Sequence, residues 1–149
     1  MALPLLGEEF IVTYGDSCLD TAIAPIILAW RRSKKPALMT VFCNENQWGA
    51  SNTIYADGRV ICHDKHDRVL GMRFIDWGTS LLTAGVLQEW PLDTAFDLSD
   101  VYNKLAKQGL LAGYEITHRF FEIGKFINGN NRGVPTAGLK TADVLLAEA

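Results

Sequence analysis

The sequence predicts one α/β domain with a mixed, mostly parallel sheet. Short apolar runs rich in β-branched residues alternate with two amphipathic helical segments, an order typical of a parallel sheet covered by helices. An Asp-Gly pair between two β-rich runs adds an inserted hairpin, and with it an antiparallel portion. A chain of 149 residues with a 48% hydrophobic share has the size and composition to bury a core.

The first third of the chain supplies two predicted strands with a helix between them. Phe10–Tyr14 is a β-branched and aromatic run that stops at Gly15-Asp16-Ser17, which indicates a buried strand ending in a loop. A helix follows over about residues 21–33, because its apolar side chains recur on one face and Pro25 lies in the tolerant first turn. Ala37–Cys43 is the second apolar strand.

The middle of the chain contains the hairpin and a long strand. Asn52–Tyr55 and Arg59–His63 flank the turn residues Ala56-Asp57-Gly58. Another strand is predicted over about residues 73–82.

The last part of the chain begins with a helix whose ends are well marked. Asp97 is the expected N-cap of a helix over residues 98–108, and Gly109 suits the position after its end. Leu111–Ile123 is predicted as one long strand, and Leu139–Ala149 as a short terminal helix.

Composition argues against several function classes. The 14 basic and 17 acidic residues give a net charge of −3, and the scattered basic residues predict no nucleic-acid partner. No apolar run reaches the roughly 18 residues that span a membrane, and the N-terminus has no signal-peptide core. Three widely spaced cysteines (Cys18, Cys43 and Cys62) fit a reducing cytoplasm. Dinucleotide, Walker, serine-hydrolase and zinc-protease motifs are absent from the sequence.

Two acidic residues are candidate metal ligands. Asp16 follows a strand and a glycine, so its carboxylate should lie at the carboxyl end of the sheet, where ligands of open α/β folds bind. Glu122 ends the last predicted strand and shares a cation with Asp16 if the two strand ends converge. The alternatives are a turn or helix-cap aspartate and an ordinary acid at the end of a strand.

Three further segments contain candidate binding residues. Lys65 offers a compact positive charge for a phosphate group, or is a solvated surface lysine. Its neighbours His63 and His66 lack a second ligand pair at zinc-site spacing, so a zinc site is disfavoured. Asp76-Trp77-Gly78 interrupts a strand, as a bulge or as a close approach to a ligand. The segment ending at Asn52 forms either the wall of a sugar pocket or a turn with a packed tryptophan.

Taken in order, these segments resemble a known family, the sugar-phosphate nucleotidyltransferases, also called nucleoside-diphosphate-sugar pyrophosphorylases. The order of the motifs is more specific than any one of them, and the branch that the chain is most similar to is the guanylyltransferases that activate mannose- or heptose-type sugar 1-phosphates. The resemblance covers roughly residues 1–124, through Ala2–Leu6, Phe10–Ser17, Pro36–Val41, Asp57–Val60, Asp64–Lys65, Ile75–Gly78, Phe96–Leu98 and Gly113–Gly124.

The resemblance implies a nucleotide-diphospho-sugar transferase fold, a three-layer relative of the Rossmann sheet. It also implies a reaction in which an NTP and a sugar 1-phosphate give an NDP-sugar and pyrophosphate, with Mg²⁺ as cofactor. Asp16 and Glu122 match the metal carboxylates of the family. Lys65, with Asp64 before it, matches the acid-lysine pair that contacts the sugar and its phosphate, and Asp76 and Gly78 match the Asn-Ala-Gly-like segment at the sugar pocket. Asn52, at the end of the candidate pocket wall, is a further expected substrate-binding residue.

The sequence also departs from the family. His66 replaces a proline, and Lys125-Phe126 replaces the usual Thr-Pro or Ser-Pro, so residues 125–149 are a divergent tail after a first unit of residues 1–124. The resemblance places the N-terminal βαβ half of the family, with its glycine-rich NTP loop, before Ala2, and we expect this half to be missing from the chain. We therefore expect the isolated chain to be inactive. A complementing N-terminal segment and a homo-oligomer are the candidate partners. The alternative is a non-catalytic sugar-phosphate-binding or subunit-interaction module.

Overall fold

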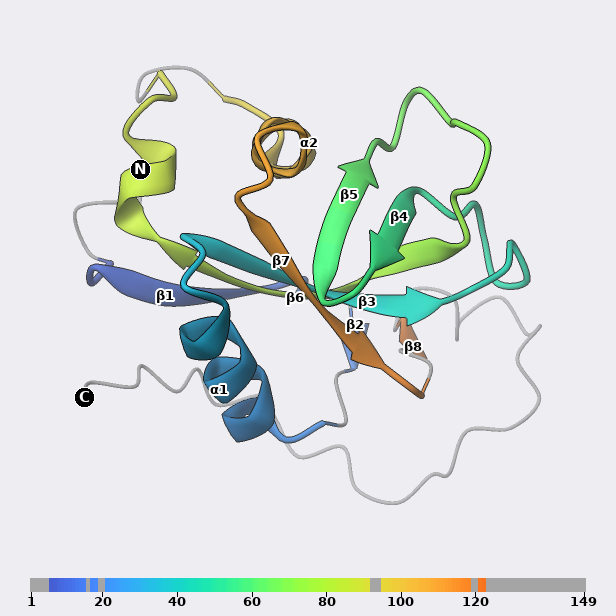
Figure 1. Ribbon diagram of the computed structural model, residues 1–149, viewed down its shortest axis with the longest axis horizontal. Coiled ribbons are helices and arrows are strands. Elements are labelled where there is room, and N and C mark those ends of the chain that lie inside the picture. The colour runs from blue at the N-terminus through green and yellow to red at the C-terminus, as the bar shows by residue number, and fades with distance from the viewer. Residues whose placement is uncertain (1–5, 16, 19–20, 92–94, 119–120, 123–149) are drawn as a thin grey trace.

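The structure is a computed structural model that describes residues 6–15, 17–18, 21–91, 95–118 and 121–122. Their fold is a mixed α/β domain, as predicted (Figure 1). Six strands form the main sheet in the order β1-β6-β3-β7-β5-β4. Their bounds are β1 (Glu9–Thr13), β3 (Ala37–Cys43), β4 (Thr53–Ala56), β5 (Arg59–His63), β6 (Phe74–Thr83) and β7 (Leu111–Ile116). The remaining elements are α1 (Ile23–Ser33), α2 (Leu98–Lys107), the 3-10 helix η2 (Ala84–Leu87) and a separate pair of short strands, β2 (Ser17–Cys18) and β8 (Phe121–Glu122).

The prediction of a mostly parallel sheet is wrong. Within the described residues, only β3 and β7 pair in parallel, whereas β6 runs antiparallel to both β1 and β3. The physical reason is the order of the strands, because β6 lies between β1 and β3, and β3 lies between β6 and β7. Each helix therefore connects strands that are not neighbours, and alternation along the sequence cannot reveal the strand inserted between them.

The predicted hairpin closes the sheet on itself. Asp57 and Gly58 form its turn with φ angles of 50° and 73°, the left-handed backbone that an Asp-Gly turn adopts. At one seam Arg59 pairs with Ala112 of β7, and at the other Thr53 pairs with Phe74 of β6. Strands β6, β3, β7, β5 and β4 thus form a closed ring, with β1 attached outside it on β6.

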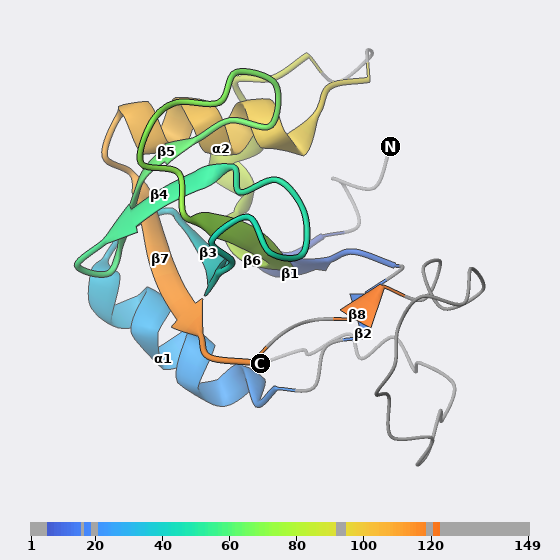
Figure 2. The ribbon, with the colours of Figure 1, turned by 90° about the vertical axis from the view of Figure 1, so that its right-hand side faces the viewer.

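Two apolar cores cover opposite faces of the sheet. Alternate residues of β3 divide between them, since Met39 faces α2 and Leu38 faces α1. Figures 1 and 2 show α1 on one side of the sheet and α2 with the hairpin on the other. The core on the α2 side includes Tyr102, and the core on the α1 side includes Trp77. Polar side chains on the α2 face therefore lie beneath the helix and the hairpin.

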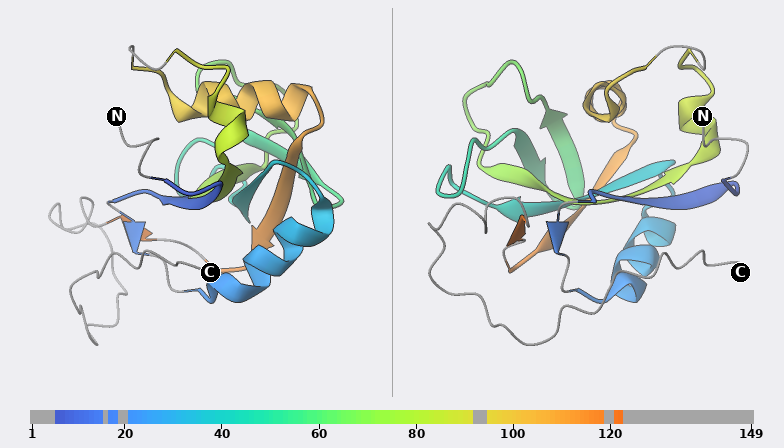
Figure 3. Two further views of the ribbon diagram at one scale, coloured as in Figure 1. Left: turned by 90° about the vertical axis from the view of Figure 1, so that its left-hand side faces the viewer. Right: turned by 180° about the vertical axis from the view of Figure 1, so that it is seen from behind.

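The predicted ends of α2 are confirmed, whereas the long strand that follows it is divided. The Ser99 amide donates to Oδ1 of Asp97 at 2.9 Å, which is the expected N-cap. Strand β7 ends at Ile116, and the indole of Trp77 donates to the carbonyl of His118 at 2.9 Å just beyond it. The chain returns as β8 to pair with β2 near the carboxyl end of β1 (Figure 3). The helix predicted over residues 139–149 lies outside the described residues.

Candidate functional site

The site is built at an irregularity in β6. Met39 pairs with Ser80, but Val41 pairs with Asp76, so β6 has extra residues at this point. Gly78 lies among them with a φ of 98°, a backbone conformation that favours glycine. The hydroxyl of Thr40 replaces the lost ladder contacts by donating to the carbonyl of Thr79 at 2.7 Å. The bulge turns Asp76 toward the α2 face of the sheet, opposite to the neighbouring Trp77.

Asp76 is a buried carboxylate, 8% exposed, held by two donors. The Gly78 amide donates to its Oδ1 at 2.8 Å, and the Tyr14 hydroxyl donates to its Oδ2 at 2.6 Å. Burial raises the pKa of Asp76 to about 6, with the two hydrogen bonds opposing the rise. Each carboxylate oxygen has one partner and retains acceptor capacity for a further donor.

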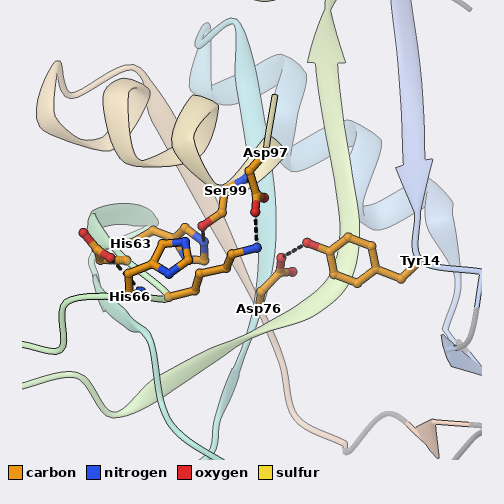
Figure 4. A network of polar contacts seen from close by, with 8 residues as sticks. Tyr14, His63, His66, Asp76, Asp97 and Ser99 are labelled. Carbon is orange, nitrogen blue, oxygen red and sulfur yellow. Dashed lines mark hydrogen bonds and ion pairs between the residues drawn. The ribbon is translucent and has the colours of Figure 1, made fainter. Parts of the chain in front are cut away.

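Tyr14 fastens the end of β1 to this bulge. Its amide donates to the carbonyl of Gly78 at 3.1 Å, in addition to the hydroxyl contact with Asp76. Desolvation, followed by the charge of Asp76, raises the pKa of Tyr14 above its ordinary value, so the phenol remains a proton donor. Figure 4 shows Asp97 near Asp76 and Tyr14, and the charge of Asp97 acts on the pKa of Tyr14 in the same direction as that of Asp76.

Lys65 reaches this neighbourhood from the loop after β5. Its Nζ forms an ion pair with Oδ2 of Asp97 (Figure 4). The hydrogen bond from Lys65, followed by the Ser99 amide, lowers the pKa of Asp97 below its usual range. Asp64 does not join the ion pair. Its carboxylate accepts from the amides of His66 and Asp67 and from the side chain of Asn103.

A chain of hydrogen bonds connects Lys65 to Asp76. It starts at Asp97, whose Oδ1 accepts the Ser99 amide, and continues through Ser99 Oγ to His63 Nε2 at 3.0 Å. The other ring nitrogen of His63 lies 2.9 Å from Thr53 Oγ1. Thr53 in turn donates to Oδ1 of Asn52 at 2.9 Å, and this oxygen also accepts the amide of Asp76 at 3.3 Å.

His63 is a neutral link in this chain. Burial lowers its pKa to about 4, and only 3% of the residue is exposed. Thr53 uses its hydroxyl proton on Asn52, so we assign the imidazole proton to Nδ1, which leaves Nε2 to accept from Ser99. Both nitrogens are therefore occupied by hydroxyl partners. Among the side chains that the structure describes, no three of His, Cys, Asp or Glu converge as a metal site would require.

The two expected metal ligands are only partly placed. Asp16 lies outside the described residues, and of Glu122 the structure describes the backbone in β8. Ser17, which follows Asp16 in the chain, pairs with Glu122. The segment that follows Asp16 and the segment that contains Glu122 therefore pair through their backbones, although Ser17 and Glu122 are 105 residues apart in the sequence.

Of the predicted binding residues, the structure brings Asn52, Lys65, Asp76 and Gly78 into one network. Sequence reasoning missed four members of this network, Tyr14, Thr53, Asp97 and Ser99. Tyr14 was treated only as part of a strand, and Asp97 only as a helix cap. Ser99 had no assigned role. The signal available for Asp97 was its position at the start of α2, but the sequence does not show that this helix begins beside the loop of Lys65.

Several solved structures share this fold. A protein from Bacillus anthracis assigned as a glucose-1-phosphate thymidylyltransferase, in complex with sucrose, is 14% identical with a TM-score of 0.69 and matches 89% of this chain and 60% of its own. HddC from Yersinia pseudotuberculosis is 20% identical with a TM-score of 0.63 over 83% of this chain and 53% of its own. The UTP-bound UGPase from Acinetobacter baumannii is 16% identical with a TM-score of 0.63 over 83% of this chain and 49% of its own.

These likenesses establish the fold that the chain shares with sugar-phosphate nucleotidyltransferases. The chain spans about half to three fifths of the length of these solved chains, 49–60%. No protein-family model and no curated protein matches the sequence. In the described part of the chain, no helix has both the length and the apolar character needed to cross a bilayer.

Proposed function

We propose that the chain forms the sugar-phosphate and metal side of a nucleotidyltransferase. The proposed reaction transfers a nucleotidyl group from an NTP to a sugar 1-phosphate and releases pyrophosphate. The observation that carries the proposal is the network that links Lys65, which solvent can reach, to the backbone amide of Asp76, whose buried carboxylate has unused acceptor capacity. The fold shared with the solved nucleotidyltransferases supports the same assignment.

In this proposal each side chain has a distinct task. Lys65 receives the phosphate of the sugar 1-phosphate, because an ammonium is a suitable partner for a dianion. Asp76 accepts a sugar hydroxyl beside the Tyr14 hydroxyl and the Gly78 amide. Asn52 fixes the backbone of Asp76 by accepting its amide. A bound sugar 1-phosphate is thereby oriented at both ends, which is the main contribution a protein makes to phosphoryl-type transfer.

We also propose that Asp16 and Glu122 hold Mg²⁺. The pairing of Ser17 with Glu122 supports this, because it brings the two chain segments together, and carboxylates are the ligands that Mg²⁺ prefers. When bound, the cation neutralises charge on the phosphates. Mn²⁺ binding followed by electron paramagnetic resonance tests the site. Asp16→Asn and Glu122→Gln should each weaken binding at least about tenfold relative to Asp57→Asn on the hairpin turn, since even residues that only support a metal ligand typically cost about tenfold or more when changed.

The main test is binding of sugar 1-phosphates to the chain by isothermal titration calorimetry. We expect α-D-mannose 1-phosphate or α-D-glucose 1-phosphate to bind, and Lys65→Met to weaken this binding at least about fivefold, the effect of one unit charge near 4 Å in water. Lys107→Met, at the exposed end of α2, is the matched control and should leave it unchanged. Absence of binding, or equal effects of the two substitutions, would contradict the proposal.

The expected inactivity of the chain by itself is a separate prediction. Mixed with an NTP, a sugar 1-phosphate and Mg²⁺, the chain should release no pyrophosphate. Release of pyrophosphate above the rate of a Lys65→Met control would overturn this prediction and leave the assigned reaction standing.

A non-catalytic binding or interaction module is the second candidate. One observation favours it, since β1 is the end strand of the sheet order and exposes 41% of Ile11. Analytical ultracentrifugation distinguishes this candidate. Self-association that is lost in Ile11→Lys, together with sugar-phosphate binding but no activity in any longer form of the chain, would favour the module.

A further inference from the structure

Asp97 divides its two carboxylate oxygens between different tasks. Oδ1 accepts the Ser99 amide at 2.9 Å and caps α2, whereas Oδ2 contacts the ammonium of Lys65. The helix backbone holds the carboxylate in place whether or not Lys65 remains beside it. The side chains of Lys65 and Asp97 are 43% and 39% exposed, so a dissolved anion can reach the ammonium.

The segment before Lys65 is fastened to the same helix. Asn103 Nδ2 donates to the carbonyl of His63 and to Asp64 Oδ2, each at 2.8 Å, and His63 Nε2 meets Ser99 Oγ at 3.0 Å. Only the flexible side chain of Lys65 is therefore free to exchange one anion for another. An incoming anion competes with a fixed carboxylate of charge −1.

We infer that Asp97 is a specificity-determining residue that makes Lys65 respond only to ligands with more than one negative charge. This inference rests on the proposed function, in which Lys65 receives a phosphate. When a monoanionic ligand binds the Lys65 ammonium, the attraction that it gains is about equal to the attraction that the displaced Asp97 carboxylate loses. Lys65 therefore adds nothing to the affinity for such a ligand. A phosphate monoester carries close to two charges above its second pKa of about 6 and gains a net attraction.

The proposed reaction changes this charge. An oxygen of the sugar phosphate forms a bond to the α-phosphorus of the NTP, the bond from that phosphorus to the bridging oxygen breaks, and pyrophosphate leaves with the electron pair. The phosphoryl group on the sugar thereby changes from a monoester with two charges to a diester-type group with one. The ion pair between Asp97 and Lys65 then forms again. As a result, the NDP-sugar is released more readily than the sugar 1-phosphate.

The test measures how much of the binding depends on Lys65. Methyl phosphate and dimethyl phosphate carry about two charges and one charge at pH 8, and ³¹P NMR titration gives their affinities for the chain. In the wild type, Lys65→Met should lower the affinity for methyl phosphate about fivefold or more and change the affinity for dimethyl phosphate by less than about twofold. In an Asp97→Asn background, Lys65→Met should weaken binding of dimethyl phosphate about fivefold and binding of methyl phosphate more strongly, about 25-fold, because the ammonium then acts on one and on two uncompensated charges.

Asparagine keeps an oxygen for the Ser99 amide, so the cap of α2 is retained, and Asp97→Ser provides a second variant with the same property. Asp100→Asn, in the same helical turn, is the control and should behave as the wild type. If Lys65→Met weakens the binding of dimethyl phosphate in the wild type, the inference is wrong and the proposed function stands. The same holds if Lys65→Met leaves this binding unchanged in both Asp97 variants. If methyl phosphate does not depend on Lys65 in the wild type, both are wrong.

Discussion

Asp76 and His63 are two buried polar residues on one chain of hydrogen bonds, and their surroundings leave them in different states. Both ring nitrogens of His63 are occupied by hydroxyls, and burial keeps the ring neutral with a pKa of about 4. Asp76 has one donor on each oxygen, a pKa of about 6, and capacity for a further partner. The comparison indicates that a saturated buried group serves the fold, whereas an unsaturated one that still ionises near neutral pH is available for a ligand.

The largest expected effect is at the saturated group. His63→Ala leaves the hydroxyls of Thr53 and Ser99 without their ring partners and removes the imidazole from beside Tyr102, whose ring centroid lies 5.9 Å away. We expect the free energy of unfolding to fall by about 2–4 kcal/mol in urea denaturation at pH 7.5. His66→Ala, at an exposed position, should cost less than about 0.5 kcal/mol. Equal losses in the two variants would contradict the structural role of His63.

The next effect has the opposite sign and lies at Asp76. Its pKa rises from 3.8 to about 6 on folding, so ionised Asp76 destabilises the fold by about 3 kcal/mol, at about 1.4 kcal/mol per pKa unit. Asp76→Asn replaces the charge with a neutral amide that keeps an acceptor and gains a donor. We expect the free energy of unfolding to rise by about 1–3 kcal/mol at pH 7.5. A loss of stability in this variant would contradict the assigned burial of a carboxylate.

The pH dependence of that gain sharpens the comparison. Between pH 3.8 and about 6, the folded protein keeps the Asp76 proton and the unfolded chain has lost it, so the contribution of Asp76 to stability falls as pH rises. His63, with its pKa lowered from 6.5 to about 4, contributes with the opposite slope, losing stability as pH falls through that window. The gain from Asp76→Asn should therefore vanish near pH 4 and reach its plateau above about pH 7. A gain that does not change with pH would exclude titration of Asp76 as its cause.

A smaller effect separates the two tasks of Asp97. Asp97→Ala removes the acceptor of the Ser99 amide and should cost about 1 kcal/mol of stability, the usual effect of losing an N-cap. Asp97→Asn keeps that acceptor and should cost no more than a few tenths of a kcal/mol, because the lost ion pair is partly exposed. Thermal and urea unfolding of both variants measure the difference. Equal losses would mean that the ion pair with Lys65, and not the cap, stabilises the fold.

The smallest expected effect on stability is at Lys65. Lys65→Met should change the free energy of unfolding by less than about 0.5 kcal/mol, as is typical of one partner of a surface ion pair. Its effect should be seen in ligand binding instead. A decrease in the free energy of unfolding of more than about 1 kcal/mol would mean that Lys65, like His63, stabilises the fold.

Local patterns made most elements predictable from the sequence. The apolar run of β3, the Asp-Gly turn between β4 and β5, and the Asp97 cap of α2 are set by residues close in the chain, and all three are confirmed. The direction of β6 and the closure of the sheet depend on which strands meet across long separations. Single pairs such as Thr53 with Phe74 fix that closure and leave no periodic signal.

The candidate site was predictable only in part, for the same reason. Lys65, Asp76 and Gly78 were found through their resemblance to ordered family motifs, because residue type and local context did not distinguish them from surface or bulge residues. Tyr14 and Asp97 join them through contacts across 62 and 32 residues. The ligand role of Asp16 and Glu122 remains a prediction, supported by the pairing of Ser17 with Glu122.

The most direct test of the account uses two amides that the structure attaches to the proposed site. The Gly78 amide bonds to Asp76, and the Ser99 amide bonds to Asp97. In a titration of ¹⁵N-labelled chain with α-D-mannose 1-phosphate, we predict that both resonances shift with one binding constant, while that of Gly109 at the far end of α2 stays in place. Saturation of the chain by this ligand with neither Gly78 nor Ser99 shifting would contradict the assignment of the site.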